Sequence, residues 1–237
     1  MKHLTKGLIL SFALLISQSC QQTKKAADQI DVSKSSETEE VASKRIAGWH
    51  TFNSEGIDEA WQMSDDGVLS FDKSRGKGGD IVTDNEYENF ELSLEWKISD
   101  CGNSGIMWAI VESTDYRWPW QTGPEMQILD NKCHPDAKIK THRAGDLYDM
   151  IETSVVNVKP AGEWNSVKIR SDQGNISFSQ NEVEVVAFTM YDESWKAMVS
   201  DSKFKDMDSF GKSRKGRIGL QDHNDKVWFR NIIITEL

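Results

Sequence analysis

Apolar and polar residues alternate along much of the chain after residue 48, a pattern typical of half-buried β-strands. The alternation is complete in Phe-Glu-Leu-Ser-Leu-Glu-Trp-Lys-Ile, residues 90–98. Shorter runs predict strands at 106–111, 167–170, 175–178, 182–188 and 227–235, the last with an apolar run that favours partial burial on both faces. Asp-Gln-Gly at 172–174 predicts a hairpin turn. Many short strands with Gly, Asn and Asp between them predict an antiparallel sandwich.

One segment has helical spacing instead. In 194–210, Trp195, Met198, Val199 and Ser202 recur at intervals of three to four residues, and Ser194 is a candidate N-cap. We expect one or two short helices at the edge of the sandwich.

The first 45 residues have a different composition. Residues 1–20 have two lysines before a short apolar run and end at Cys20, the pattern of an export signal. The run is too short to span a bilayer. Cys20 at the cleavage point favours a bacterial lipoprotein, with an ordinary secretory signal as the alternative. Residues 21–45 are polar and predict a flexible tether. The domain is therefore expected at 46–237, facing the periplasm or anchored to the outer membrane.

The domain is acidic. The chain has 28 Lys+Arg, 38 Asp+Glu and a net charge of −10. Without the two lysines of 1–20 and the five charges of each sign in 21–45, 21 basic and 33 acidic residues remain, a charge of −12. This excess argues against nucleic acid as a partner. Export would allow Cys101 and Cys133 to form a disulfide, although two free buried thiols are an equal alternative.

A polar cluster lies on the predicted strand at 125–130. Glu125 and Gln127 share one face of it, about 6.6 Å apart, while Met126 and Ile128 face the other way. Such a face suits a polyhydroxylated ligand, although a merely solvated strand face is the alternative. Asp130 has the opposite parity and joins them only through a bulge.

A second cluster surrounds His223. Gln221 shares its parity, and acidic neighbours would favour the protonated imidazole, as a proton donor or shuttle requires. Arg230, within an apolar strand, needs either an ion-pair partner or a polar pocket. An ion pair with Glu125 or Asp130 is the structural alternative.

Aromatic residues are a further candidate feature. Of the nine tryptophans, Trp118 and Trp120 flank Pro119 in a predicted loop, where one of them would stack on a sugar. Trp96, Trp164 and Trp228 fall on predicted strands and are expected in the core. Histidine spacing favours no metal site, and calcium held by loop carboxylates is the ion that we would expect if any binds.

The clusters, in this order, resemble the 3-keto-disaccharide hydrolase family. The matching stretches are Asn-Ser-Gly-Ile at 103–106, Glu-Met-Gln-Ile-Leu-Asp at 125–130, Ala-Gly-Asp-Leu-Tyr at 144–148, Pro-Ala-Gly-Glu-Trp-Asn at 160–165, Lys-Gly-Arg-Ile-Gly-Leu-Gln-Asp-His at 215–223 and Trp-Phe-Arg-Asn-Ile at 228–232. The resemblance implies a concanavalin-A-like jelly roll of two antiparallel sheets. It also implies an exported enzyme acting on glycosides whose C3 hydroxyl is oxidised to a ketone.

This chemistry suggests roles for the clusters. Glu125 or His223 would remove the C2 proton, while Arg230 and Gln127 would stabilise the enolate oxygen. Hydroxyl groups would be bound by Asn103, Asp130, Tyr148 and Gln221, and no cofactor would be required. Two alternatives stay open: a retaining glycosidase with two carboxylates, and a carbohydrate-binding module without activity.

Overall fold

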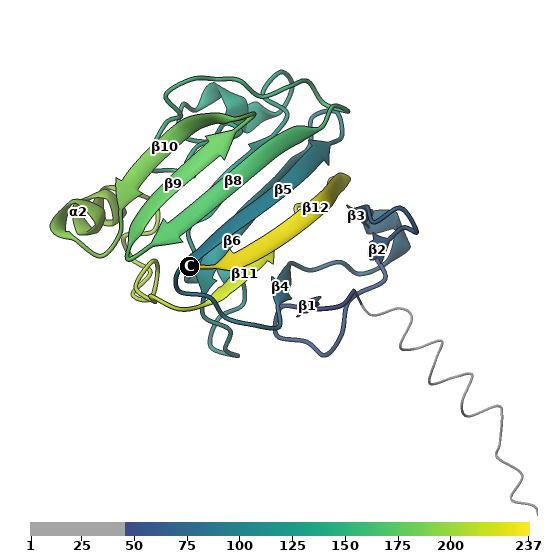
Figure 1. Cartoon of the computed structure of the whole chain (residues 1–237), viewed down its shortest axis with the longest axis horizontal. Coiled ribbons are helices and arrows are strands. Elements are labelled where there is room, and N and C mark those ends of the chain that lie inside the picture. The colour runs from purple at the N-terminus through teal and green to yellow at the C-terminus, as the bar shows by residue number, and fades with distance from the viewer. Residues whose placement is uncertain (1–45) are drawn as a thin grey trace, which may run out of the picture. The chain divides into compact units, whose positions relative to one another are not determined.

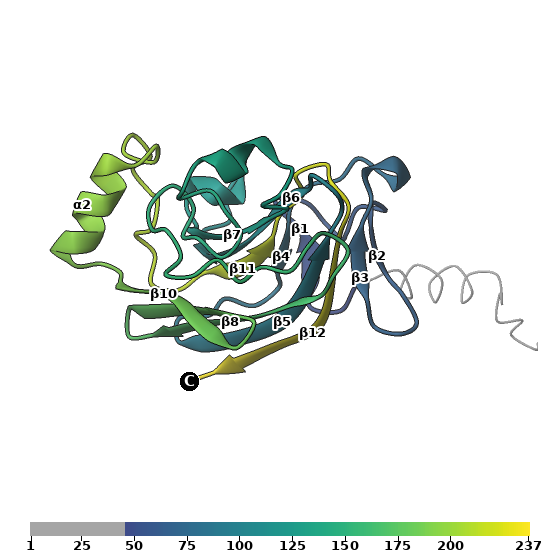
Figure 2. The same cartoon turned by 90° about the horizontal axis from the view of Figure 1, so that it is seen from above.

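The computed structural model describes residues 46–237, so the expectations for 1–20 and 21–45, including Cys20, lie outside the described residues. Two antiparallel sheets pack face to face, and Figure 2 shows them as two layers. This arrangement confirms the predicted all-β jelly-roll sandwich. No helix within the described range combines the length and apolar character needed to cross a membrane.

The smaller sheet has five strands in the order β1-β4-β11-β6-β7. Their bounds are β1 Trp49–Thr51, β4 Ile81–Thr83, β11 Arg217–Leu220, β6 Asn103–Ile110 and β7 Glu125–Leu129. Every residue of β6 and β7 is buried, because other segments cover this sheet on the face away from its partner (Figure 2).

The larger sheet has seven strands in the order β10-β9-β8-β5-β12-β3-β2 (Figure 1). Their bounds are β10 Val183–Thr189, β9 Asn175–Gln180, β8 Asn165–Asp172, β5 Phe90–Ile98, β12 Val227–Glu236, β3 Leu69–Phe71 and β2 Trp61–Met63. The predicted alternation of β5 is exact, since its even-numbered residues are buried and its odd-numbered ones half-buried. β8 and β9 pair around Gln173 and Gly174, both with positive φ, as the predicted hairpin requires.

Helices are few in the described residues. The α-helix α2 spans Glu193–Asp201 beside β10 (Figure 1), and short 3-10 helices occupy Lys73–Arg75 (η1), Pro119–Gln121 (η2) and Pro135–Lys138 (η3). The cap of α2 is Asp192, whose side chain accepts a hydrogen bond from the Trp195 amide at 2.7 Å. The prediction of Ser194 as N-cap was therefore wrong by two residues, because the aspartate satisfies the free amides of the first turn.

The core lies between the sheets and is strongly aromatic. Trp96, Phe90 and Phe178 are almost fully buried there, and the Trp108 and Phe178 rings meet edge to face at 5.4 Å. Cys101 and Cys133 form a disulfide that ties the segment just before β6 to the loop after β7. Of the two sequence-based alternatives, the structure has the disulfide.

The outer face of the seven-stranded sheet carries two tryptophans that the sequence predicted to lie in the core. Trp164 and Trp228 are half-buried there and flank the Lys97 ammonium, which lies 4.9 and 4.8 Å from their ring centroids. The prediction that both belong to the core was therefore wrong. The strand β12 is also less buried than its apolar run suggested, because a register shift after Arg230 leaves Ile233 59% exposed.

Candidate active site

Most of the predicted polar residues meet on the face of the five-stranded sheet that points away from the core. Directly paired residues of antiparallel strands share a face, and the register places Gln127 opposite Gly105 and Glu125 opposite Met107. Between them, Ile106 and Met126 face the core. The Gln221 amide donates to the Gly105 carbonyl at 3.0 Å, which places Gln221 beside this row.

A cavity of about 210 Å³ opens above these residues. It is lined by Asn103, Trp120, Glu125, Gln127, Tyr148, Lys203, Phe204, Gln221 and His223. Seven of these nine were singled out from the sequence, and they come from β6, β7, the connections that follow them and the segment after β11. Glu125 contributes the one carboxyl group in this lining.

Glu125 lies across Gly105. A Cβ atom on Gly105 would stand 2.0 Å from Glu125 Oε1, so only glycine leaves room for the carboxyl group. Glu125 is 6% exposed, and burial raises its pKa to about 8. The Asp80 carboxyl raises the pKa of Glu125 further. The Lys203 ammonium and a 3.4 Å hydrogen bond from Gln221 Nε2 to Glu125 Oε2 both lower it.

The segment 145–148 continues the sheet beyond β7. Gly145 donates to the Gln127 carbonyl at 2.9 Å, and Tyr148 donates to the Glu125 carbonyl at 3.0 Å. These backbone bonds place Tyr148 directly beside the buried carboxyl. Burial raises the Tyr148 pKa, so the phenol keeps its proton and remains a hydrogen-bond donor.

Lys203 approaches the cavity from the segment after α2. Its Nζ lies 3.9 Å from the centroid of the Tyr148 ring, and its backbone amide donates to Asp149 Oδ2 at 2.7 Å. Asp149 Oδ1 in turn lies 2.9 Å from His142 Nε2, so a single carboxylate joins both segments. Although much of Lys203 is exposed, its ammonium packs over Tyr148, and burial lowers its pKa while Glu125 opposes that shift.

Two amide side chains of the cavity lining have a carbonyl oxygen without a hydrogen-bond partner. Gln127 Nε2 donates to Asn103 Oδ1 at 3.1 Å, and Gln221 Nε2 donates to Glu125. The Oε1 atoms of Gln127 and Gln221 are buried without a hydrogen-bond partner. An unsatisfied buried acceptor costs about 1–3 kcal/mol, so a hydroxyl group that reaches either atom would be bound favourably.

The rim of the cavity combines an aromatic and a titratable group. Trp120 is half-buried and packs against the small cluster of Phe52, Val82, Met107 and Ile110, leaving part of its ring in the cavity wall. His223 is exposed at the rim, where its ring lies 6.3 Å from that of His134. A group at the edge of the cavity can exchange protons with water, which Glu125 on the floor does much less readily.

Three predicted site residues lie elsewhere. Arg230 pairs with Glu95 at 2.9 Å on the outer face of the seven-stranded sheet. This position does not agree with the predicted role at the site. It does not agree with the alternative ion pair to Glu125 or Asp130 either. Asp130 accepts from the amides of Cys101 at 2.9 Å and Lys132 at 3.1 Å, which occupies both carboxylate oxygens in a turn.

Trp118 is also outside the cavity lining. It is 40% exposed and stacks with Arg117. Of the two loop tryptophans, it is therefore Trp120 that borders the cavity.

Sequence reasoning missed Lys203, Phe204 and Asp80. Lys203 and Phe204 lie beyond the end of a helix, and no spacing connects them with the strands that they approach. Asp80 is 6% exposed below the loop at 222–226, and burial raises its pKa to about 7. The one signal in the sequence was an acidic residue next to the apolar pair Ile-Val. That pattern alone does not indicate a buried carboxyl group.

One group of potential metal ligands occurs within the described residues. It consists of Cys101, Asp130 and Cys133, and the two sulfur atoms are already joined in the disulfide. A calcium site needs several oxygen ligands, and in the cavity Glu125 supplies the only carboxylate among the lining residues.

Comparisons with known proteins converge on one family. Residues 41–235 match the model of the 3-keto-alpha-glucoside-1,2-lyase-like domain. The 3-keto-disaccharide hydrolase of Bacteroides thetaiotaomicron is 35% identical over 222 residues, which cover 82% of this chain and 76% of that protein.

Solved structures agree with this match. A crystal structure described as a candidate glycosyl hydrolase, from Parabacteroides distasonis, has a TM-score of 0.75 and 32% identity, covering 82% of this chain and 90% of that one. A Bacillus subtilis protein of unknown function with a galectin-like fold has a TM-score of 0.51 at 12% identity, covering 79% and 89% of the two chains. The second likeness concerns the fold alone.

Proposed function

The chain belongs to the family of 3-keto-alpha-glucoside-1,2-lyase-like domains and is a glycan-active hydrolase, and we propose that it cleaves glycosides whose C3 hydroxyl has been oxidised to a ketone. The observation that carries the proposal is the buried carboxyl of Glu125, the one carboxyl group that lines a small cavity, beside the Lys203 ammonium. A volume of about 210 Å³ is below that of typical ligand pockets and suits one sugar ring.

The proposed reaction has two stages. A base removes the acidic hydrogen on C2 next to the ketone, and the electron pair forms an enolate at the C3 oxygen. The enolate re-forms the ketone as a C1–C2 double bond develops and the C1 leaving group departs with a proton from an acid. Water then adds its oxygen to C1 and a proton to C2, so the net change is hydrolysis and the oxidation state of the ring is unchanged.

Glu125 is the proposed base. A general base works best when its pKa lies near the working pH, and burial places the pKa of Glu125 at about 8. A weakly acidic C–H group requires a stronger base than an ordinary carboxylate, and the raised pKa supplies that basicity. The ionised fraction of Glu125 rises with pH, so the proposed step becomes faster as pH approaches 8 from below.

Lys203 takes the role first suggested for Arg230. Negative charge develops on the C3 oxygen as the enolate forms, and a partly buried ammonium stabilises it far more than one in bulk water. The Tyr148 phenol, held beside Glu125 by its backbone, is a second donor for the same oxygen. Both groups are fixed before substrate enters, through Asp149 and the segment 145–148.

The remaining lining residues have binding and proton-transfer roles in this proposal. Asn103, Gln127 and Gln221 hydrogen-bond ring hydroxyls, and the unpartnered Oε1 atoms of the two glutamines supply the acceptors. Trp120 packs on the sugar face. His223, exposed at the rim, donates a proton to the departing oxygen and recovers it from solvent.

The two-carboxylate glycosidase is less well supported. A retaining mechanism needs two carboxyl groups about 5–5.5 Å apart on either side of the scissile bond. Asp130, the second carboxyl of the strand motif, faces the turn at Cys101 and Lys132 and does not line the cavity. A single carboxyl suits proton abstraction better than double displacement.

We also propose that the enzyme is exported and anchored through a lipid on Cys20, facing the periplasm or held at the outer membrane. The signal-like sequence of 1–20 supports this, and so does the Cys101–Cys133 disulfide, since disulfides persist in oxidising compartments. Labelling with a radioactive fatty acid should mark the wild type and not a Cys20→Ser variant. No cofactor is required in this proposal, so dialysis against a chelator should leave turnover unchanged.

The direct test compares matched substrates. The purified protein is incubated with a 3-keto-disaccharide and with the same disaccharide unoxidised, and products are identified by mass spectrometry. Cleavage of the 3-keto compound alone supports the proposal. Cleavage of both at similar rates would favour the glycosidase, and binding without cleavage would favour the binding module. Glu95→Gln, a carboxyl-to-amide change outside the cavity, is the control variant.

A further inference from the structure

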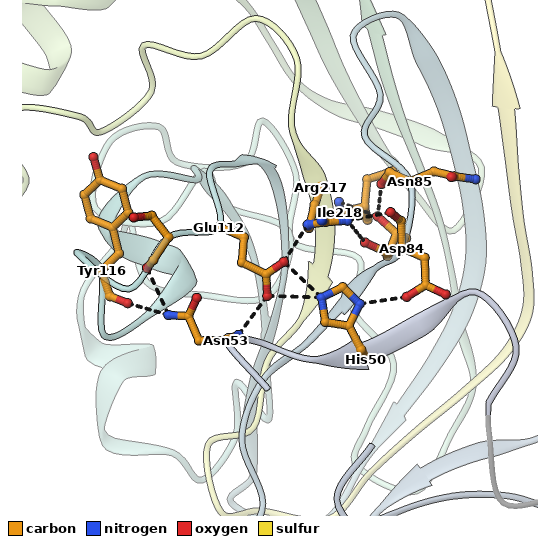
Figure 3. Close-up of polar contacts among 10 residues, drawn as sticks. His50, Asn53, Asp84, Asn85, Glu112, Tyr116, Arg217 and Ile218 are labelled. Atoms are coloured by element: carbon orange, nitrogen blue, oxygen red, sulfur yellow. Dashed lines mark hydrogen bonds and ion pairs between the residues drawn. The ribbon is translucent and has the colours of Figure 1, made fainter. Parts of the chain in front are cut away.

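A cluster of charged groups joins four separate segments of the chain (Figure 3). It lies at the end of the five-stranded sheet opposite Cys101, where β6 ends and β11 begins. At its centre is Glu112, the second residue of the connection from β6 to β7. Its carboxylate forms an ion pair with Arg217, with 2.8 Å between Nε and Oε2, accepts a hydrogen bond from the Asn53 backbone amide at 2.7 Å, and lies 3.0 Å from His50 Nε2. We call Glu112, His50, Asn53 and Arg217 the clasp.

The clasp is highly charged and yet mostly enclosed. The side chains of His50 and Glu112 are each 17% exposed, and that of Arg217 is 20% exposed. His50 Nδ1 lies 2.7 Å from Asp84 Oδ1, so both ring nitrogens face a carboxylate, and only the imidazolium can donate to both. Arg217 also donates to the carbonyls of Thr83 and Asp84, at 2.8 and 2.6 Å.

Asn53 extends the clasp along the connection. Its Nδ2 donates to the carbonyls of Ser113 and Tyr116, at 3.0 and 2.7 Å. Asn53 has a φ of +56°, a conformation that asparagine tolerates better than most residues. The turn after β1 is therefore bent into a shape that presents three donors to one loop.

The held loop leads to the active-site cavity. Four residues after Tyr116, Trp120 lies in η2 and forms part of the cavity wall, and Glu125 begins β7 soon afterwards. The far side of the loop is also tied, because Tyr116 donates to Ser209 Oγ at 2.7 Å and Thr122 accepts from the Gly211 amide at 2.8 Å. The same segment, 203–211, carries Lys203.

We infer that the clasp is a positioning device that fixes the 112–122 connection, and through it the substrate-facing ring of Trp120. The part of the inference that concerns substrate binding rests on the proposed function. The part that concerns the position of the loop rests on the contacts of Glu112. None of the four clasp residues lines the cavity, so they act on substrate only through the loop.

The test uses the full folded protein and three variants. Glu112→Gln removes the central charge at constant size. Asn53→Gly keeps the positive φ and the amide bond to Glu112 and removes only the two bonds to Ser113 and Tyr116, so it guards against a variant that fails to fold. Glu95→Gln is the matched control, because Glu95 also pairs with an arginine and an asparagine, on the other sheet.

Amide hydrogen exchange measures the loop directly. Hydrogen bonds to charged groups are worth enough that losing them should speed exchange in 112–122 about tenfold in Glu112→Gln and about threefold in Asn53→Gly. Glu95→Gln should exchange like the wild type in this segment. Unchanged exchange in Glu112→Gln and Asn53→Gly, or an equal increase over all peptides, would overturn the inference.

Kinetics with a 3-keto-disaccharide measure the consequence. A looser Trp120 should raise KM about three- to tenfold and leave kcat within about twofold, because Glu125 and Lys203 are not touched. Equal KM values in the wild type and both clasp variants would overturn the link to substrate binding. If the wild type itself turns over no such substrate, the proposed function fails, and the exchange experiment still decides whether the clasp holds the loop.

Discussion

Replacement of Glu125 by glutamine separates the cost of burying this carboxyl from its use in catalysis. The side chain is 6% exposed, and burial raises its pKa from 4.5 to about 8. In Glu125→Gln the side chain keeps its shape and can still accept the hydrogen bond from Gln221, but it can no longer ionise. We expect a more stable protein at neutral and alkaline pH that no longer cleaves 3-keto-glycosides.

The magnitude follows from proton linkage. Between pH 4.5 and 8 the folded state holds a proton that the unfolded chain has released, so the folded state binds more protons and stability falls as pH rises. Each pH unit is worth about 1.4 kcal/mol, so between pH 5 and pH 9 the wild type should lose about 4 kcal/mol relative to Glu125→Gln. Above the folded-state pKa the difference levels off.

The assay is urea unfolding of both proteins at several pH values, followed by the change in tryptophan fluorescence. The shift of Asp80 contributes to both proteins and largely cancels in the difference. A difference in unfolding free energy that stays flat from pH 5 to pH 9 would refute the burial argument. Turnover in Glu125→Gln within about tenfold of the wild type would refute its assignment as the base, since a general base contributes about 10²–10⁴-fold.

Three further changes test other parts of the account. Gly105→Ala places a methyl group 2.0 Å from the pocket carboxylate oxygen, so kcat should fall about 100-fold in steady-state assays while circular dichroism shows an intact fold; normal turnover would contradict the tight contact. Lys203→Met keeps much of the packing on Tyr148 and should lower kcat about 10²–10³-fold with a smaller change in KM; a change confined to KM would reduce Lys203 to a binding residue. Cys101→Ser with Cys133→Ser opens a loop of 32 residues and should lower the free energy of unfolding by about 2–4 kcal/mol in denaturant titrations; equal midpoints would show that the bridge is dispensable.

The strands and their faces were predictable because burial on one side imposes a period of two. The alternation of 90–98 and the hairpin at 172–174 are local signals, and the structure confirms both. The parity of Glu125 and Gln127 was predictable for the same reason. In contrast, the apolar run of β12 predicted too much burial, since the register shift near Asn231 depends on the neighbouring strand.

Residues that depend on tertiary contacts were harder to place. Arg230 looked unusual in an apolar strand, but its partner Glu95 is 135 residues away on β5. Lys203 enters the cavity because Asp149 holds its backbone, and neither residue has a sequence pattern that connects them. The resemblance to a family ordered the motifs correctly, whereas only the structure separates those at the cavity from those that stabilise the fold.

The most direct test of the central claim is turnover of a 3-keto-disaccharide in deuterium oxide. If cleavage begins with removal of the C2 proton and ends with addition of water across C1 and C2, the released 3-keto sugar carries one solvent deuterium on C2. The sample is quenched early, and product incubated without enzyme corrects for spontaneous exchange. The account predicts one deuterium at C2 for each bond cleaved. Cleavage with no deuterium at C2 beyond that control would contradict it.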